Sequence, residues 1–316
     1  MRYAVAVTTF DRSFRPSRRT ALTAAALAPI GALGLSGCTY ASVRLAEESN
    51  AIPEVDLSGI TTQEAIAALV PERIRAAGEL VNGAATNYPP GEFLSNGVPV
   101  GYDIDVLAAI GKVLGLRTRT ESAVFAQIIP SIGSKYDVGL SGFTINDERL
   151  KAVNMVSYFR AGVSYAVAAG NPYGIDPHSL CGKRPAVQVG TYQEEKMMAL
   201  DDECRAAGKS GIDLLSYASN NDAVTNVAGG KADILVADSP VTAYAITRSR
   251  GTLEQVGEIE ESALNGICVA QSDQALTEAI CQAVQHLIDE GHLLAIMTAW
   301  GNESGMIETA KINPRS

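Results

Sequence analysis

The chain has 316 residues, of which 47% are apolar and 19% charged, as in a soluble globular protein and unlike a disordered or fibrous one. Its only long uncharged stretch, residues 20–37, is mostly Ala and Gly and is a weak candidate for a membrane span. The formal net charge of −10 would repel phosphate backbones and anionic lipid surfaces. Nucleic-acid binding and electrostatic membrane attachment are therefore poor hypotheses.

Residues 1–37 are typical of a secretory signal peptide. Arg18 and Arg19 precede the uncharged stretch, and Ser17-Arg-Arg-Thr-Ala-Leu22 is similar to a twin-arginine export signal, although Ala21 stands where an aromatic residue is usual. Leu35-Ser-Gly-Cys38 resembles a bacterial lipobox, which implies that Cys38 becomes the lipidated first residue, with palmitate as one acyl group. The alternative is a core helix that ends in a buried Cys. The export route, Sec or twin-arginine, stays open.

Cleavage before Cys38 would leave a chain that is longer than a usual single domain and more acidic than the full sequence. The mature protein would have 279 residues, more than the usual single domain of about 100–200, so two lobes are expected. It would carry 20 basic and 34 acidic residues, a formal charge of −14. Residues 38–60 are polar and are predicted to form a lipidated tether without a core of its own.

The four remaining cysteines, Cys181, Cys204, Cys268 and Cys281, can form disulfides if the protein is exported. Their order along the chain favours the pairs 181–204 and 268–281, each of which closes a short loop. For the second pair, two buried thiols are an equally good interpretation. None of the cysteines has zinc spacing, and the three histidines (His178, His286 and His292) are scattered, so no metal is expected.

The predicted elements alternate between helices and short strands. A helix over 62–77 is interrupted near Pro71 and ended by Gly78, and a helix over 103–114 is capped by Gly115. Further on, 137–141 is a predicted buried strand, and Asn146 can cap a helix that begins at residue 147.

Two later strands are also followed directly by helix caps. Strand 186–189 precedes a capping box from Thr191 to Glu194. Strand 232–237 precedes Asp238, with Ser239 as the expected cap and Pro240 as the first helical residue. Such polar groups at the carboxyl ends of strands predict a ligand crevice in an open α/β sheet.

Taken together, these segments make the sequence resemble a bacterial extracellular solute-binding protein of family 3, the polar amino-acid receptors of ABC importers. The resemblance runs from about residue 70 to the C-terminus and rests on five segments: Tyr88-Pro-Pro-Gly-Glu-Phe93 with Gly101-Tyr-Asp-Ile-Asp-Val106, Asp137 to Arg149, Val187 to Gln193, Gly230 to Pro240, and Gly291 to Gly301.

The resemblance implies an α/β fold of the two-lobed periplasmic-binding-protein type II, or Venus flytrap, with two hinge strands. Lobe 1 would comprise residues 61–164 and 265–316, and lobe 2 residues 165–264. The chain would leave lobe 1 near Gly162 and return near Gly266. Ligand would bind between the lobes, which then close.

The resemblance also implies the ligand contacts. Arg149 would bind an α-carboxylate and Asp238 an α-ammonium; the other expected ligand-binding residues are Tyr88, Phe125, Gly142, Thr144, Thr191 and Tyr192. Each has a purely structural alternative. Arg149 could be a surface side chain beside two acids, Thr191 only a helix cap, and the aromatic residues part of the core. Asp103 matches an acidic position near the cleft but also suits a helix end.

One position departs from the family pattern. Ala85 stands where many relatives carry an Asp that faces the ligand side chain. A cationic side chain would lose its counter-charge there, so lysine, arginine and histidine are in doubt as ligands. Neutral or acidic amino acids, and larger derivatives such as opines, remain open.

The sequence therefore predicts a non-catalytic amino-acid receptor that delivers its ligand to the permease of an ABC importer. It would need no cofactor, bind no nucleic acid, act as a monomer and stay in the cell envelope through its lipid or in the periplasm. One alternative is a cyclohexadienyl-dehydratase-like enzyme on the same scaffold, with Glu92, Glu194 or Glu195 as the acid. Another is a ligand-sensing component of a receptor.

Overall fold

A computed structural model describes residues 52–315. The predicted signal peptide, the lipobox with Cys38 and the tether up to residue 51 lie outside the described residues. Within 52–315, no helix is long and apolar enough to cross a membrane.

The first part of the described chain builds one half of a mixed sheet. Two short helices, α2 (Glu64–Ala67) and α3 (Glu72–Ala77), are separated at Pro71, and Gly78 ends α3 in the left-handed conformation. Strand β1 (Glu79–Ala84) pairs in parallel with β5 (Arg117–Ser122) and β6 (Val138–Gly139). Helix α4 (Tyr102–Leu114) connects these strands and ends at Gly115, as the sequence predicts.

Smaller elements border this half of the sheet. A three-stranded sheet contains β2 (Asn87–Tyr88), β3 (Glu92–Ser95) and β4 (Val98–Val100). Two short helices, α5 (Phe125–Ser131) and α6 (Asp147–Leu150), flank β6 in the chain. These segments carry the aromatic, glycine and arginine residues expected at the ligand site.

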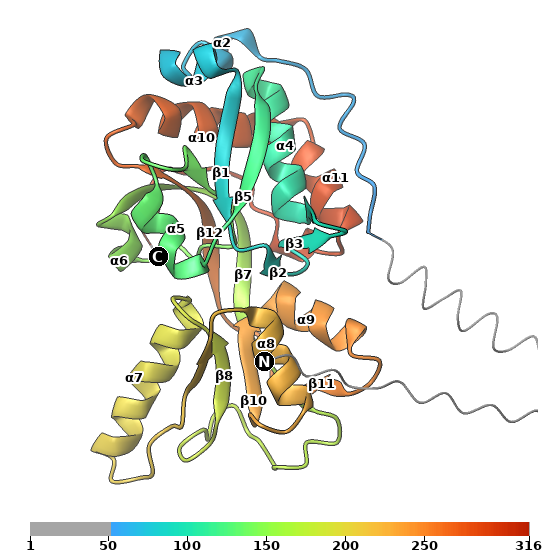
Figure 1. The fold of residues 1–316 in the computed structure, drawn as a ribbon, viewed down its shortest axis with the longest axis vertical. Helices are drawn as coiled ribbons and strands as arrows, with labels where there is room; N and C mark the ends of the chain where they lie inside the picture. The colour runs from blue at the N-terminus through green and yellow to red at the C-terminus, as the bar shows by residue number, and fades with distance from the viewer. Residues whose placement is uncertain (1–51, 316) are drawn as a thin grey trace, which may run out of the picture. The chain divides into compact units, whose positions relative to one another are not determined.

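Two long antiparallel strands connect the halves of the molecule (Figure 1). They are β7 (Val153–Ala168) and β12 (Glu260–Ala270), which contain Gly162 and Gly266 respectively. Their pairing shifts between Glu260 and Ala263 and between Asn265 and Gly266. The sheet order β5-β1-β6-β12-β7-β10-β8-β9, with β11 on β7, therefore runs through the two crossing strands.

The second half alternates strands and helices. Its strands are β8 (Pro185–Gln188), β9 (Leu215–Tyr217), β10 (Ile234–Asp238) and β11 (Leu253–Gln255). Its helices are α7 (Tyr192–Ala206), α8 (Asn220–Ala228) and α9 (Ser239–Arg248). Val187, Met197 and Val236 belong to a core cluster that the strands share with α7. This is the second α/β lobe of a type II periplasmic binding fold.

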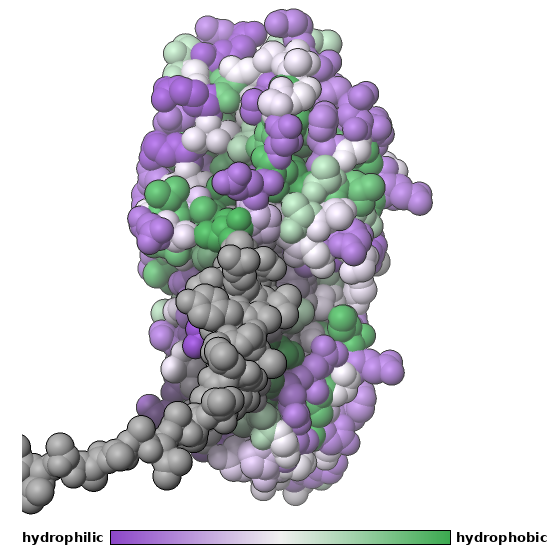
Figure 2. Space-filling view, turned by 90° about the vertical axis from the view of Figure 1, so that its right-hand side faces the viewer, coloured by the Kyte–Doolittle hydropathy of each residue, from purple (hydrophilic) through white to green (hydrophobic). Residues whose placement is uncertain are grey.

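The C-terminal segment returns to the first half. Helices α10 (Gln274–Asp289) and α11 (His292–Ala299) precede a short 3-10 helix, η1 (Glu303–Gly305). Ile280 and Leu293 are buried in one core with Leu80 and Ile110, because α10 and α11 pack against α4. On the face drawn in Figure 2, hydrophilic residues dominate among the coloured ones and hydrophobic residues form small patches, as the acidic composition leads one to expect.

Two predicted boundaries need correction. The tether was expected to reach residue 60 without a core, but Ile60 is 5% exposed in the first core, and Val55 and Leu57 pack against it. The reason is that the apolar side chains of this otherwise polar segment can bury their surface against the first core. Asp238 is the N-cap of α9, and Ser239, the expected cap, is its first helical residue.

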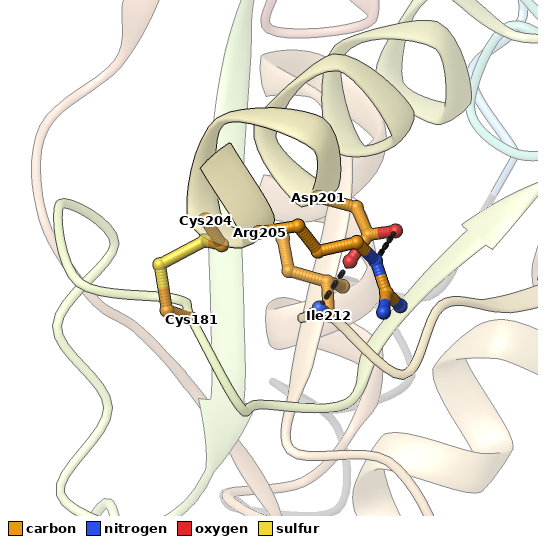
Figure 3. The surroundings of a disulfide bond; sticks show 5 residues. All are labelled: Cys181, Asp201, Cys204, Arg205 and Ile212. Atoms are coloured by element: carbon orange, nitrogen blue, oxygen red, sulfur yellow. Dashed lines mark hydrogen bonds and ion pairs between the residues drawn. A yellow bond between two sulfur atoms is a disulfide. The ribbon is translucent and has the colours of Figure 1, made fainter. Parts of the chain in front are cut away.

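Of the two cysteine pairs that the sequence order favours, the structure bonds the first. Cys181 and Cys204 are bonded across a sequence separation of 23 residues (Figure 3). The bond attaches the last turn of α7 to the segment before β8, and Asp201 adds a contact by accepting a hydrogen bond from Ile212 N at 2.6 Å.

For the second pair, which the sequence left open between a disulfide and two buried thiols, the structure has free thiols at Cys268 and Cys281. Cys268 is buried in β12 in a cluster with Phe125 and Met155, whereas Cys281 lies on α10 and packs against a different core. The helix and the strand therefore hold the two sulfurs in separate layers, which the short sequence separation did not reveal.

We expect removal of the Cys181–Cys204 bond to lower the free energy of unfolding by about 3 kcal/mol, because a closed loop of this length restricts the unfolded chain. Urea titration of the Cys181→Ala/Cys204→Ala variant measures the loss. Cys281→Ala, which removes a free thiol and keeps the disulfide, is the matched control. Dithiothreitol should lower its stability as much as it lowers that of the wild type. A double variant as stable as the wild type would contradict the prediction.

Candidate functional site

Ten residues from both halves line one small cavity. Its free volume is only about 10 Å³, roughly one water-sized sphere, so the two halves are nearly in contact there. The lining residues are Tyr88, Phe125, Gly142, Thr144, Arg149, Gln188, Thr191, Tyr192, Gln193 and Asp238. The structure thus brings together all eight residues that the sequence singled out as ligand contacts.

The Arg149 side chain is buried, with the whole residue only 7% exposed, and is fixed from both halves. Asn146 caps α6 by accepting a hydrogen bond from Arg149 N at 2.9 Å, as the sequence predicts. The guanidinium donates to Thr144 O at 2.8 Å and, across the cavity, to Gly190 O at 3.0 Å. The surface alternative for Arg149 is therefore wrong.

The positive charge of Arg149 has aromatic neighbours instead of a protein carboxylate. Among residues 52–315, no carboxylate forms an ion pair with its guanidinium. Its central carbon lies 5.7 Å from the ring centre of Phe125 and 5.5 Å from that of Phe143. The two rings stack at 4.5 Å. A buried guanidinium in this position is suited to an anionic group that enters the cavity.

Asp238 supplies the opposite charge from the second half. It ends β10 and is 5% exposed, and its Oδ1 accepts a hydrogen bond from Gln193 Nε2 at 2.7 Å. Burial raises the pKa of Asp238 to about 6, against the opposing effects of the Gln193 and Tyr88 hydrogen bonds and the charge of Arg149. The carboxylate is therefore mainly ionised at neutral pH and is suited to a cationic group.

The segment with Gly142 and Thr144 forms one wall of the cavity. Gly142 has a φ of 60°, and a Cβ there would lie 3.6 Å from the Tyr88 ring and 3.8 Å from Asp238 Oδ2. Its carbonyl accepts a hydrogen bond from Asn265 Nδ2 at 2.9 Å. The left-handed conformation of Gly142 and the hydrogen bond from the hinge strand β12 thus fix this wall.

A pair of buried carboxyl groups holds the same wall from behind. Asp103 Oδ2 accepts a hydrogen bond from Gly142 N at 2.9 Å, and Asp103 Oδ1 accepts one from Tyr158 OH at 2.7 Å. Glu92 Oε1 accepts a hydrogen bond from Ser141 Oγ. Burial raises the pKa of Asp103 to about 6 and, together with repulsion from Asp103, raises the pKa of Glu92 well above its usual range. The pair therefore retains a proton near neutral pH.

Thr191 and Tyr192 begin α7 beside the cavity. Thr191 Oγ1 accepts a hydrogen bond from Glu194 N at 3.2 Å and donates to Gln188 O at 2.7 Å, so Thr191 is a helix cap as well as a lining residue. The Tyr192 hydroxyl donates to Glu261 Oε2 at 2.8 Å, which directs it toward β12.

Sequence reasoning missed two lining residues, Gln188 and Gln193. Gln188 is 2% exposed; its Nε2 donates to Asn87 Oδ1 at 3.3 Å across the cavity, and its Oε1 is buried without a partner. Gln193 is 3% exposed and bonds Asp238. Both lie in the recognised segment from Val187 to Gln193, but glutamines at a strand end and in a first helical turn carry no specific signal.

The described residues offer no site for a bound metal: within 52–315, no three His, Cys, Asp or Glu side chains are grouped so that they could hold one. A larger cavity of about 650 Å³ lies between β3 and the helices α8 and α9, but its walls include none of the eight expected ligand contacts. Among the described cavities, the small one with Arg149 and Asp238 is thus the candidate ligand site.

Comparison with known proteins places this geometry in a family. Residues 80–303 match the model of the bacterial extracellular solute-binding proteins, family 3. An arginine-binding protein of Corynebacterium glutamicum is 39% identical over 252 residues, which cover 78% of this chain and 82% of the relative.

Solved structures agree with this match. An ancestral arginine-binding protein bound to arginine has a TM-score of 0.66 at 30% identity, covering 71% of this chain and 98% of the other. The structure of an ancestral arginine-binding protein bound to glutamine has a TM-score of 0.65 at 31% identity, covering 72% and 99%.

An ancestral amino-acid-binding protein described as a precursor of cyclohexadienyl dehydratase is also similar, with a TM-score of 0.66 at 26% identity and coverage of 74% and 99%. The family match spans well over half of the chain, and the two lobes with their paired crossing strands fit it. The chain belongs to the bacterial extracellular solute-binding proteins of family 3.

Proposed function

We propose that this protein captures a free α-amino acid in the cavity, with Arg149 binding the α-carboxylate and Asp238 the α-ammonium. One observation carries the proposal: a buried guanidinium without a protein counter-ion and a buried carboxylate face one cavity from opposite halves. A zwitterion would satisfy both charges at once. The remaining lining residues would complete the site, with Tyr88 and Phe125 against the aliphatic part of the ligand.

The cavity must open to admit a ligand, since about 10 Å³ is too small for an amino acid. The contacts that close it include Arg149 to Gly190 and Gln188 to Asn87, and each joins the two halves. We propose that residues 165–264 move as one lobe against 61–164 and 265–316, about β7 and β12. Ligand contacts made only in the closed form would then favour closure.

Arginine is the ligand we propose. The relative of Corynebacterium glutamicum is described as arginine-binding. The buried pair Glu92 and Asp103 lies close enough to Asp238 to feel its charge. Because the pair retains only one proton, its remaining negative charge and that of Asp238 exceed the single positive charge of Arg149. This local excess of acids favours a cationic side chain even though Ala85, which is fully buried, supplies no charge. The neutral alternative is glutamine, which one similar ancestral protein binds.

A binding role without catalysis fits the positions of the possible acids. Glu92 is fully buried behind the cavity wall, Glu194 accepts a hydrogen bond from Gly190 N at 2.7 Å, and Glu195 accepts one from Asn146. None of the three lines the cavity. Incubation with prephenate or arogenate tests the enzymatic alternative, because formation of an aromatic product would refute a purely binding role.

We propose that the protein acts as a monomer outside the cytoplasm and delivers its ligand to the permease of an ABC importer. A lipid on Cys38 would hold it at the membrane. The family match and the arginine-binding relatives described as ABC transporter proteins support the transport role. The intact mass of protein extracted from membranes tests the anchor, since an unmodified Cys38 would contradict it.

Arg149→Ala is expected to cost about 2–5 kcal/mol of arginine affinity, because the ligand carboxylate would remain buried without its partner. Asp238→Asn should weaken arginine binding but spare an analogue that lacks the α-ammonium. The exposed Arg75, paired with Glu72, provides the control Arg75→Ala, which should bind as the wild type. Titration calorimetry decides the assignment, and binding by Arg149→Ala within a few-fold of wild type would refute it.

Acidification should change affinity and stability in opposite directions. Below a pH of about 6, protonation of Asp238 removes the partner of the ammonium, so arginine affinity should fall by up to about tenfold per pH unit. The pKa of Asp238 is higher in the folded protein than its ordinary value near 3.8, so its contribution to unfolding free energy is lost as pH rises through about 6.

The ligand-free protein should therefore gain this contribution on acidification from pH 7.5 to 5. Calorimetry and urea titration between these values measure both trends, and Asp238→Asn should flatten the part due to this residue. An affinity that stays constant to pH 5 would contradict the role of Asp238.

Arginine should bind at least about tenfold more tightly than citrulline, its neutral isostere, a difference of about 1.4 kcal/mol. The reason is that the negative charge on Asp238 and on the Glu92–Asp103 pair behind the cavity wall exceeds the positive charge of Arg149. A thermal-shift screen with both ligands, glutamine and opines orders the affinities, because saturating ligand stabilises the folded state. Equal or tighter binding of citrulline or glutamine would instead support the interpretation of Ala85 as a missing counter-charge.

A further inference from the structure

Two fully buried carboxyl groups lie behind the wall of the ligand cavity, Glu92 from β3 and Asp103 from the first turn of α4. Their side chains are hydrogen-bonded to each other. A carboxylate can only accept hydrogen bonds, so a bond between two carboxyl groups requires that one of them carries a proton. Within residues 52–315, neither group forms an ion pair with a basic side chain. The pair is therefore held by a proton instead of a cation.

The hydrogen bonds around the pair indicate which carboxyl group carries this proton. Both oxygens of Asp103 already accept, Oδ2 from Gly142 N at 2.9 Å and Oδ1 from Tyr158 OH at 2.7 Å. Glu92 Oε1 accepts from the Ser141 hydroxyl, but Glu92 Oε2 is buried and receives no hydrogen bond. A proton on Glu92 Oε2 turns this unsatisfied acceptor into a donor toward the Asp103 carboxylate.

The electrostatic surroundings favour the same position for the proton. Burial and the charge of Asp103 raise the pKa of Glu92 well above its usual range. Burial raises the pKa of Asp103 only to about 6, because the donors Tyr158 and Gly142 stabilise its carboxylate. The other titratable groups that face the pair come from β2, α4, β7 and β10: Tyr88, Tyr102, Tyr158 and Asp238. Burial keeps the tyrosines neutral, and the negative charge of Asp238 further favours a neutral Glu92.

The pair is connected to two peptide groups near the ligand. Asp103 holds the N–H of Gly142, which lines the cavity. Glu92 orients the Ser141 hydroxyl, whose oxygen accepts a hydrogen bond from Ala85 N at 2.9 Å. Ala85 occupies the position at which the family resemblance places the side chain of the ligand. A change in the charge of the pair would therefore act on both parts of the cavity wall.

We propose that Glu92 is a neutral acid that donates a hydrogen bond to the Asp103 carboxylate, and that this bond positions Gly142 and Ala85 for the ligand. Both acids are positioning residues, since neither lines the cavity. The positioning role rests on the proposed function, whereas the place of the proton does not. An amide N–H can replace the proton at position 92, but an amide at position 103 removes an acceptor that Gly142 or Tyr158 needs.

Unfolding of the ligand-free protein between about pH 7 and 8.5 tests the place of the proton. The unfolded chain has lost it in this range, because the ordinary pKa of a Glu is 4.5, while the folded chain retains it. The folded state therefore loses stability as the pH rises, and the unfolding constant should increase about tenfold more per pH unit in the wild type than in Glu92→Gln. Urea titrations measure the two slopes.

Glu64→Gln makes the same change at an exposed acid of α2 and is the matched control, which should keep the slope of the wild type. Equal slopes for the wild type and Glu92→Gln would overturn the assignment of the proton to Glu92.

Titration calorimetry with arginine at about pH 7.5 tests the positioning role. Glu92→Gln keeps a donor toward Asp103 and should bind within about threefold of the wild type. Glu92→Met has a similar length but no donor, and Asp103→Asn lacks an acceptor, so each should bind at least about tenfold more weakly. Glu64→Gln should bind as the wild type does.

Equal arginine affinities of Glu92→Met and Glu92→Gln would overturn the positioning role, and this comparison decides even if Asp103→Asn does not fold. A wild type that binds no arginine would refute the proposed ligand and the positioning role with it. The place of the proton would still be decided by the urea titrations, because they use no ligand.

Discussion

The buried guanidinium of Arg149 is the interaction on which the ligand site depends. Two carbonyl oxygens, from Thr144 and Gly190, hold it between the halves, and no carboxylate in residues 52–315 forms an ion pair with it. A buried charge with incomplete compensation is costly for folding alone. Under the function we propose, a ligand would bring the missing anion, and the gain would appear only in the closed, occupied state.

The buried acidic groups near the cavity differ in charge. Asp238 stays ionised because hydrogen bonds with Gln193 and Tyr88 and the positive charge of Arg149 stabilise its carboxylate. Glu92 and Asp103 together retain one proton. Asp103 holds Gly142 N, and Glu92 holds the neighbouring Ser141 hydroxyl. One acidic region thus supports the cavity wall and, in the function we propose, would also bind the ligand ammonium through Asp238.

Strands β7 and β12 connect the ligand cavity to the crossing between the two halves. Asn265 of β12 donates a hydrogen bond to the carbonyl of Gly142 at the cavity. Gly162 of β7 permits the close approach of the two strands, because a Cβ there would lie 2.7 Å from Glu260 O of β12. The geometry of the crossing strands therefore bears directly on the cavity wall.

The sequence alone determined the features that depend on neighbouring residues. The cap of α6 by Asn146, the cap of α7 by Thr191 and the end of α3 at Gly78 follow from local backbone needs. Family resemblance, carried by short segments, extended this to eight of the ten residues that line the cavity. Only the tertiary structure decided which distant groups meet: Gln188 and Gln193 at the ligand cavity, Glu92 with Asp103, the separation of Cys268 from Cys281, and the burial of Ile60. These contacts arise from packing between elements, for which periodicity and spacing along one chain carry no information.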